Sequence, residues 1–488
     1  MTALRLATVL GLLLTACTAP APTAPTAAPA AATAVSQAGA TAAAVVPTVV
    51  AAAPTVAAAA NPAATAVAQA APTVAAAAAS AATAIAKVAG PPVTLNFWHG
   101  MNGSEPGTQG GTLRTLVDQY KQVAPNVTIN LDFTPYTANE LQQKVTASIA
   151  ANNTPDLVQA FESDVAAWYR AGAIAPLDDF VKQTLTAADL DDVQKALLDS
   201  GRFPQYENRQ LSFPFNRSIY VIYYNKPELT KVGFPDGPKT WDDVQNACDK
   251  IVADMPCYAV QPGPEMLVVG VWSRGGEILS PDLKKSLFNG PEGVAALTFD
   301  VTNVKAKKAY VSKGFDWQND LGAKKVAMSP ITTIAGDPFI AKAVNDAFEL
   351  AIAPPPTAAG KPPRTLFSGT NLSIMKSSPD KEQAAWAFIK WLTETKQSAY
   401  WTVQTNYLPV RKSALNEQIL KDYIAKTPRF KVALAMIPTG TTSPSVAGWA
   451  DARTFVSDAV TNAVTQVAEP KAALDDAAKK SDEALARD

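Results

Sequence analysis

The sequence predicts an α/β fold of two domains built on a parallel sheet. Apolar and polar residues alternate over 93–97 and 127–133, which is typical of strands. Apolar residues recur at helical spacing over 113–123 and 141–149. Strands that alternate with helices favour a parallel sheet with ligand sites at the carboxyl ends of its strands. The chain has 488 residues, enough for two domains behind an Ala-rich front end.

The first elements can be placed in order along the chain. Gly100 and Gly103 end the first strand, and Pro125 ends the helix that follows it. After the second strand, Thr137 and Glu140 form a capping-box pattern that predicts the start of another helix. A short apolar run over 157–161 continues the β-α-β-α pattern as a third strand.

The middle of the chain predicts a crossing between domains, followed by a mainly helical half. Extended segments at 211–215 and 219–224 are separated by Asn216-Arg217-Ser218, and a short strand is expected at 326–328. Helix starts are expected at three places, namely Thr240-Trp241-Asp242-Asp243, Ser378-Pro379-Asp380 and Pro470. A further helix is expected from the apolar spacing over 452–463.

The N-terminal 92 residues are predicted to be a targeting signal and a tether rather than part of the folded protein. Residues 1–16 carry Arg5 and then an apolar run that is too short to span a bilayer, as in a secretion signal. Leu14-Thr15-Ala16-Cys17 resembles a bacterial lipoprotein box, in which the Cys is lipidated; an ordinary signal peptide with a chance Cys is the alternative. Residues 17–92 are rich in Ala, Pro and Thr and are expected to form a tether.

Charge and residue counts exclude several classes of function. With 42 basic and 43 acidic side chains, the chain lacks the excess of positive charge that is typical of a nucleic-acid-binding protein. A single His and three Cys exclude a Cys/His metal site. Cys248 and Cys257 could form a disulfide in an oxidising compartment or remain two buried thiols. Because nucleophile, metalloprotease and nucleotide-binding motifs are absent from the sequence, we expect neither an enzyme nor a cofactor.

Several local strings, in a fixed order, resemble the family 1 extracellular solute-binding proteins of ABC importers. The likeness is greatest to the glycerol-3-phosphate-binding type and its sugar-binding relatives. It spans most of residues 93–488 and is carried by Asn96-Phe97-Trp98-His99-Gly100, Pro155-Asp156-Leu157-Val158-Gln159-Ala160-Phe161-Glu162, Pro214-Phe215-Asn216-Arg217-Ser218, Tyr223-Tyr224-Asn225-Lys226, Pro238-Lys239-Thr240-Trp241 and Thr405-Asn406-Tyr407-Leu408-Pro409-Val410.

This resemblance implies a two-lobed periplasmic-binding-protein clamshell of the class II type, with a hinge and discontinuous lobes. One lobe is expected to comprise 93–212 with 325–365, and the other 213–324 with 366–488. A monomer, lipid-anchored outside the cytoplasm, would capture a small molecule between the lobes and dock on the membrane subunits of an ABC permease.

The resemblance also implies a set of ligand-binding residues at matching positions. A carboxylate at Glu162 would accept hydrogen bonds from two hydroxyls of a sugar or polyol. The other implied positions are Tyr136, Ser218, Thr333 beside Thr332, Gly369 and Tyr407. Trp98, Trp272 and Trp449 are candidate stacking platforms, although a Trp more often belongs to the core. His99, on a loop at the end of a strand, is a candidate cleft residue.

Three departures from the family pattern bear on the ligand. Ser368-Gly369 stands where the family has two glycines, and Gly263-Pro264-Glu265 lacks the aromatic shelf. No arginine precedes Arg453 in the stretch where the phosphate-binding one is expected, so Arg217, Arg274 and Arg453 are possible substitutes. The prediction is therefore a sugar, polyol or glycerol-3-phosphate-like ligand. A secreted, lipid-anchored glycan hydrolase or an adhesive lipoprotein remains an alternative.

Overall fold

A computed structural model describes residues 91–136, 139–251 and 255–487. The leader, the expected lipidation site Cys17, the tether up to residue 90 and Thr137 of the capping-box pattern lie outside these residues. Residues 89–488 cluster as one compact unit. In the described part of this unit, no helix combines the length and apolar character that crossing a membrane requires.

The first lobe is a twisted sheet covered by helices. β1 (Val93–His99) pairs in parallel with β2 (Val127–Phe133) and with β3 (Leu157–Ala160), as the alternating pattern predicts. α4 (Gln109–Val123), α5 (Glu140–Ala150) and α6 (Glu162–Arg170) follow these strands in turn. Leu95 and Phe97 of β1 are fully buried in a core that also contains residues of α4, which fixes the strand's inward face.

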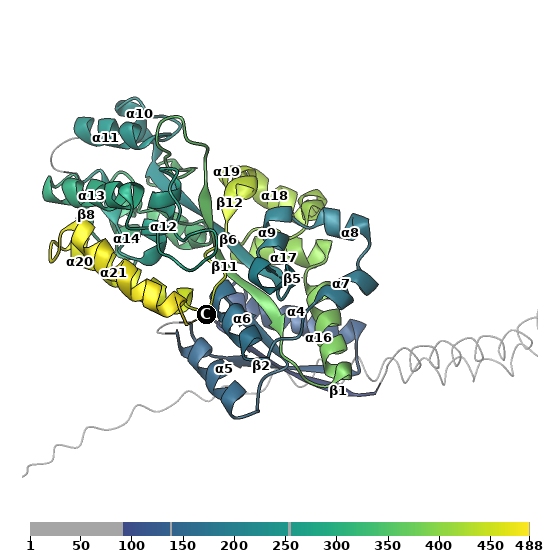
Figure 1. The fold of residues 1–488 in the computed structure, drawn as a ribbon. Coiled ribbons are helices and arrows are strands. Elements are labelled where there is room, and N and C mark those ends of the chain that lie inside the picture. Colours follow the sequence, from purple (N-terminus) through teal and green to yellow (C-terminus); the bar gives the residue numbers. More distant parts are fainter. Residues whose placement is uncertain (1–90, 137–138, 252–254, 488) are drawn as a thin grey trace, which may run out of the picture. The chain divides into compact units, whose positions relative to one another are not determined.

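One long strand runs from the first lobe into the second. β6 (Phe213–Asn225) pairs with β11 (Thr365–Ile374) over its first half and with β10 (Leu350–Ala353) over its last residues. Figure 1 shows β6 and β11 between two groups of helices. The expected break at residues 216–218 is wrong, because Asn216, Arg217 and Ser218 pair with β11, where a β-bulge at Thr370 and Asn371 absorbs the irregularity.

The second lobe is built on a smaller sheet. β7 (Tyr258–Val260) pairs in parallel with β8 (Ala309–Val311), and Met328 bridges both β7 and β6. Its main helices are α11 (Trp241–Lys250), α12 (Pro264–Trp272), α13 (Pro291–Lys305), α20 (Trp449–Val464) and α21 (Pro470–Leu485). Thr240 caps α11 as predicted, since its Oγ1 accepts from Asp243 N at 3.0 Å.

Shorter elements complete the described fold. Their bounds are α7 (Asp178–Thr184), α8 (Ala187–Asp192), α9 (Lys195–Asp199), α10 (Lys226–Lys231), α14 (Trp317–Gly322), α15 (Asp337–Val344), α16 (Pro379–Leu392), α17 (Thr395–Thr405), α18 (Gln418–Lys426), α19 (Phe430–Met436), β4 (Arg202–Phe203), β5 (Arg209–Gln210), β9 (Thr332–Thr333), β12 (Gly440–Thr441) and the 3₁₀ turns Pro204–Tyr206, Ile334–Gly336, Lys412–Asn416 and Ile437–Thr439.

Core packing divides the chain differently from the expected lobe boundaries. α16 and α17 pack against β1 and α4, so Phe388 and Trp401 share a core with Leu95, although 366–488 was assigned to the second lobe. Conversely, Met328 lies in the core of the second lobe. Figure 1 shows α12, α13, α20 and α21 of this lobe grouped together. The chain therefore crosses between lobes more often than strand and helix patterns reveal.

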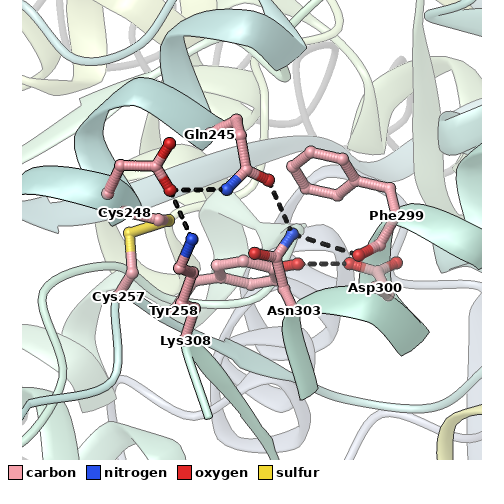
Figure 2. Close-up of a disulfide and its surroundings, with 9 residues drawn as sticks. Gln245, Cys248, Cys257, Tyr258, Phe299, Asp300, Asn303 and Lys308 are labelled. Carbon is pink, nitrogen blue, oxygen red and sulfur yellow. Dashed lines mark hydrogen bonds and ion pairs between the residues drawn. A yellow bond between two sulfur atoms is a disulfide. The ribbon is translucent and has the colours of Figure 1, made fainter. Parts of the chain in front are cut away.

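A disulfide fastens α11 to β7. Cys248 and Cys257 are joined, with their Cα atoms 5.1 Å apart, which resolves the open choice between a bridge and two thiols. Figure 2 shows the bridge beside a polar network in which Tyr258 Oη donates to Asp300 Oδ1 at 2.9 Å. Lys308, also drawn there, forms an ion pair with Asp249. The bridge lies within the second lobe, at the start of β7.

Candidate ligand-binding cleft

Two adjoining cavities, here together called the cleft, lie between the start of α6 and the starts of α12 and α20. The smaller encloses about 360 Å³ and the larger about 700 Å³ of empty space open to solvent. They share Phe161, Ser163 and Arg453. The other residues used below are Glu162, Tyr220, Glu265, Ser368, Gly369 and Trp449 in the smaller cavity, and Tyr136, Asp164, Pro264 and Asp458 in the larger.

The first-lobe wall is the first turn of α6. Because β3 ends at Ala160 and Phe161 is extended, α6 begins with Glu162 and Asp164 at the carboxyl end of a parallel sheet. Acidic side chains are favoured there by the helix dipole. The Phe161 ring packs edge-on against Tyr136, 4.9 Å between centroids, and the Tyr136 hydroxyl donates to Gln159 O.

Glu162, which lines the smaller cavity, belongs to a buried ion pair. Arg217 Nη2 lies 2.8 Å from Glu162 Oε1, and the two side chains are 0% and 4% exposed. Arg217 Nη1 also donates to Gly369 O at 3.1 Å. The pair is not aligned as a hydrogen bond, and Arg217 Nε has no hydrogen-bond partner in the described part of the chain. Arg217 therefore neutralises Glu162 rather than presenting a free cation to the cleft.

The strand residues around this pair explain why glycine occupies position 369. Gly369 has φ +85°, and a Cβ there would meet Asn216 O at 2.0 Å. Beside it, Ser218 pairs with Ser368, and its Oγ accepts from Ala335 N at 3.0 Å. Ser218 thus holds the turn after β9 rather than lining either cavity.

The second-lobe wall combines a second ion pair with a tryptophan. Arg453 of α20 pairs with Glu265, the second residue of α12, and lies over the ring of Phe161 with 5.2 Å from its Cζ to the centroid. Burial lowers the pKa of Arg453, but the Glu265 carboxylate outweighs this and raises that pKa above its usual value. Trp449, the first residue of α20, is 1% exposed.

Asp164 is the most strongly perturbed acid of the cleft. Burial raises its pKa to about 7, although the backbone N–H of Phe161 and the charge of Arg453 oppose the shift. Phe161 N donates to Asp164 Oδ2 at 3.4 Å. At neutral pH this carboxyl is therefore partly protonated, so it can act as a hydrogen-bond donor as well as an acceptor.

Three of the six residues implied by the resemblance line the cleft, and the other three do not. Glu162 and Gly369 line the smaller cavity, and Tyr136 lines the larger. Ser218, Thr333 and Tyr407 line neither cavity. Thr333 pairs with Tyr220, which does line the smaller cavity, and Tyr407 precedes Leu408, whose N donates to Arg217 O at 2.7 Å.

Of the four further aromatic candidates, Trp449 alone lines the cleft. Lys144 Nζ lies 4.1 Å from the ring centroid of Trp98, and Arg364 Cζ lies 4.4 Å from that of Trp272, so both rings are covered by cations. His99 is 4% exposed among aromatic rings, and burial lowers its pKa to about 4. His99 is therefore a neutral core residue at pH 7.

A separate apolar cavity lies inside the second lobe and accounts for Arg274. Its empty space of about 590 Å³ includes space open to solvent, and Trp241 and Asp300 are among its lining residues. Arg274 Cζ lies 4.0 Å from the centroid of the Trp241 ring, and burial lowers the pKa of Arg274 to about 10. Arg274 is thus held away from the cleft.

Sequence reasoning missed some wall residues and misjudged others. Asp164 and Phe161 were not proposed as ligand-binding residues, although Phe161 belongs to a string that carries the resemblance. Asp164 could have been predicted, because acidic residues in the first turn of a helix that follows a parallel strand often lie at the ligand site. Glu265, noted only as a departure from the aromatic shelf, is the partner of Arg453.

Comparison with known proteins identifies the family. Residues 104–399 match the bacterial extracellular solute-binding protein family. A putative binding protein of Brucella abortus is 25% identical over 382 residues, 74% of this chain and 86% of its own. The sn-glycerol-3-phosphate-binding periplasmic protein UgpB of Salmonella paratyphi A is 25% identical over 422 residues, 81% of this chain and 93% of its own.

Solved structures show the same fold. UgpB from Mycobacterium tuberculosis, in complex with glycerophosphocholine, superposes with a TM-score of 0.69 at 24% identity, covering 82% of this chain and 99% of its own. The sugar-binding protein MalE of Xanthomonas citri gives 0.70 at 19% identity, covering 81% and 98%. The fold is thus the two-lobed clamshell, and nothing in these relatives supports the glycan hydrolase alternative. The chain belongs to the bacterial extracellular solute-binding protein family and is not an enzyme.

Proposed function

We propose that this protein captures a neutral sugar or polyol in the cleft and delivers it to the membrane subunits of an ABC permease. The protein works outside the cytoplasm as a monomer, held to the membrane by a lipid on Cys17. Ligand contacts to α6 in one lobe and to α12 and α20 in the other favour the closed form, which docks on the permease.

Two buried polar atoms on the cleft wall carry this proposal. Trp449 Nε1 has no hydrogen-bond partner in the residues that the structure describes, and Glu162 Oε1 is held there by its ion pair with Arg217 but by no aligned hydrogen bond. Both side chains line the smaller cavity. Buried polar atoms are rarely left unpaired in folded proteins. Ligand hydroxyls, which both donate and accept, would pair the carboxylate and the indole N–H together.

The charge balance of the cleft favours a neutral ligand. Arg217 and Arg453 are each held by a carboxylate, so neither is a free cation for a phosphate. Phe161 and Trp449 line the smaller cavity, where aromatic carbon atoms can contact the C–H surface of a sugar. Carboxylates, amphipathic rings and a solvent-open cavity are what polyhydroxyl recognition requires.

A glycerophosphate ester is the second candidate. The similar protein from Salmonella paratyphi A is named for sn-glycerol-3-phosphate binding. The similar protein from Mycobacterium tuberculosis was solved in complex with glycerophosphocholine. Arg453 lies in the cleft and could contact a phosphate if Glu265 released it.

A ligand screen separates the two candidates. The full chain is melted with polyols, mono- and oligosaccharides, glycerol 3-phosphate and glycerophosphodiesters, and hits are confirmed by calorimetry. A ligand at 100 times its Kd stabilises the folded chain by about 2.7 kcal/mol. We expect shifts confined to neutral polyhydroxyl compounds; shifts confined to phosphate esters would favour the second candidate, and none with either class would contradict both.

A matched pair of variants then tests the site. Trp449→Phe removes the unpaired indole N–H of the cleft, whereas Trp272→Phe makes the same change at a buried tryptophan outside it. We expect Trp449→Phe to weaken binding of the best ligand about tenfold and Trp272→Phe to leave it unchanged. Equal effects of the two changes would contradict the assignment of the cleft.

A further inference from the structure

Arg453 is the one basic residue among those lining the two cavities of the cleft. Its guanidinium is enclosed on two sides, by Glu265 from α12 and by the face of Phe161 from the start of α6. The side chains of Arg453 and Glu265 are 29% and 25% exposed, so the pair is partly dehydrated but can still be reached by a ligand.

We propose that Glu265 determines the charge specificity of the cleft, by holding Arg453 and so excluding phosphate-bearing ligands. This inference rests on the proposed function, since it explains how the cleft selects a neutral polyhydroxyl compound. In the absence of the Glu265 carboxylate, the same cleft would accept a phosphate monoester.

The first reason is that Glu265 occupies the face of Arg453 that a phosphate needs. Arg453 Nη2 donates to Glu265 Oε1, and Glu265 is the one carboxylate within ion-pair distance of Arg453 among the described residues. An arginine binds phosphate through the same forked N–H groups with which it binds a carboxylate. A phosphate must therefore displace Glu265 before it can make its strongest contact.

The second reason is repulsion. Glu265 lines the smaller cavity beside Glu162, and Asp164 and Asp458 line the larger. A phosphate placed near Arg453 would lie among these carboxyl groups and would be repelled by them. Because Arg217 neutralises Glu162 and Asp164 is partly protonated at neutral pH, Glu265 and Asp458 supply most of this repulsion. Only Glu265 both repels the phosphate and blocks the arginine, so it is the decisive member of the set.

The position of Glu265 suits such a role. It is the second residue of α12, after Gly263 and Pro264, so its carboxylate is fixed at a helix start where negative charge is favoured. The same first turn would otherwise be attractive to an anion. Glu265 therefore supplies, from the protein, the negative charge that the helix start and Arg453 both favour.

The test is Glu265→Gln, which removes the charge while keeping the size of the side chain. Titration calorimetry of the full chain with glycerol 3-phosphate compares wild type and variant at low and physiological salt. We expect affinity for glycerol 3-phosphate to rise at least tenfold in Glu265→Gln, and more at low salt. Wild type that already binds glycerol 3-phosphate as tightly as its best neutral ligand would overturn the inference.

Two controls make the result specific. Glu277→Gln removes one carboxylate from an ion pair with Arg364, 2.7 Å apart and outside both cavities, and is expected to leave phosphate affinity unchanged. Arg453→Gln added to Glu265→Gln should abolish the gain. A gain that survives in the double variant, or that Glu277→Gln reproduces, would show that net charge and not the Arg453 pair is responsible, against the inference.

The outcomes distinguish this inference from the proposed function. Wild type that binds a sugar or polyol, together with a Glu265→Gln variant that gains no phosphate affinity, retains the function and overturns the role of Glu265. Wild type that binds no neutral ligand, with a variant that gains phosphate affinity, supports the role of Glu265 and contradicts the proposed ligand. Circular dichroism melts of each variant confirm that the chain is folded.

Discussion

Removing Arg217 should destabilise the protein far more than removing the whole Glu162–Arg217 pair. The two charges lie 2.8 Å apart and both side chains are at most 4% exposed. At an effective dielectric constant of about 20, their attraction is about 6 kcal/mol, which offsets a desolvation cost of several kcal/mol for each ion. The pair as a whole therefore contributes little net stability, whereas each ion depends strongly on the other.

A double-mutant cycle at Glu162 and Arg217 gives expected changes in the free energy of unfolding. Arg217→Met leaves Glu162 buried without its counter-charge and should cost about 3–5 kcal/mol, and Glu162→Gln should cost a similar amount. The double variant should lie within about 2 kcal/mol of wild type. The hydrogen bond from Arg217 Nη1 to Gly369 O is lost in both variants that lack Arg217, so its contribution cancels in the coupling energy of this double-mutant cycle.

Urea unfolding at pH 7, followed by tryptophan fluorescence, measures each member of the cycle. Lys195→Met is the surface control, because Lys195 and Asp199 form an exposed pair whose loss should cost less than about 1 kcal/mol. Strictly additive single effects would refute the claim that Glu162 and Arg217 form a mutually dependent buried pair. So would an Arg217→Met variant no less stable than Lys195→Met.

Three further predictions concern pH, the backbone and the disulfide. Burial raises the pKa of Asp164 to about 7, so folding favours its protonated form and the wild-type protein should lose stability as pH rises from 4 to 8. Asp164→Asn should remove this loss. A Tm difference between the two proteins that does not change with pH would contradict the prediction. Gly369→Ala should lower Tm much more than Gly360→Ala, because both glycines have positive φ but only Gly369 lacks room for a Cβ, and equal losses would argue against the close approach of Asn216 O. Replacing Cys248 and Cys257 together by Ala should cost about 2–3 kcal/mol with no change in ligand affinity, and a reductant should lower the Tm of wild type but not of the double variant.

Local periodicity was enough for the first lobe's sheet and for several helix starts. The alternation over 127–133 coincides with β2, and the Thr240 and Pro470 patterns coincide with the starts of α11 and α21. These features are set by residues within one or two turns of each other, so a single sequence contains them. The break expected at residues 216–218 failed because the partner strand, not local preference, holds Asn216 to Ser218 extended.

The cleft chemistry could be predicted only in part, because it depends on pairs distant in sequence. Glu162 was implied by the resemblance, yet its partner Arg217 was considered only as a possible phosphate ligand. Arg453 and Glu265 are separated by 188 residues, and no local pattern indicates that they meet. Lobe membership is equally non-local, since α16 packs on β1 although most of the chain lies between them.

If the proposed function holds, the position of Arg217 links ligand recognition to the movement of the lobes. Arg217 belongs to β6, the strand that pairs with the first lobe's β11 and continues into the second lobe, and it reaches both the Glu162 side chain of α6 and the backbone of Gly369. A ligand hydroxyl that binds Glu162 therefore acts on a group already coupled to the crossing strand. Hinge closure and ligand binding would share this one ion pair, so changes at Arg217 should alter closure and affinity together, whereas changes at Glu265 should alter the choice of ligand alone.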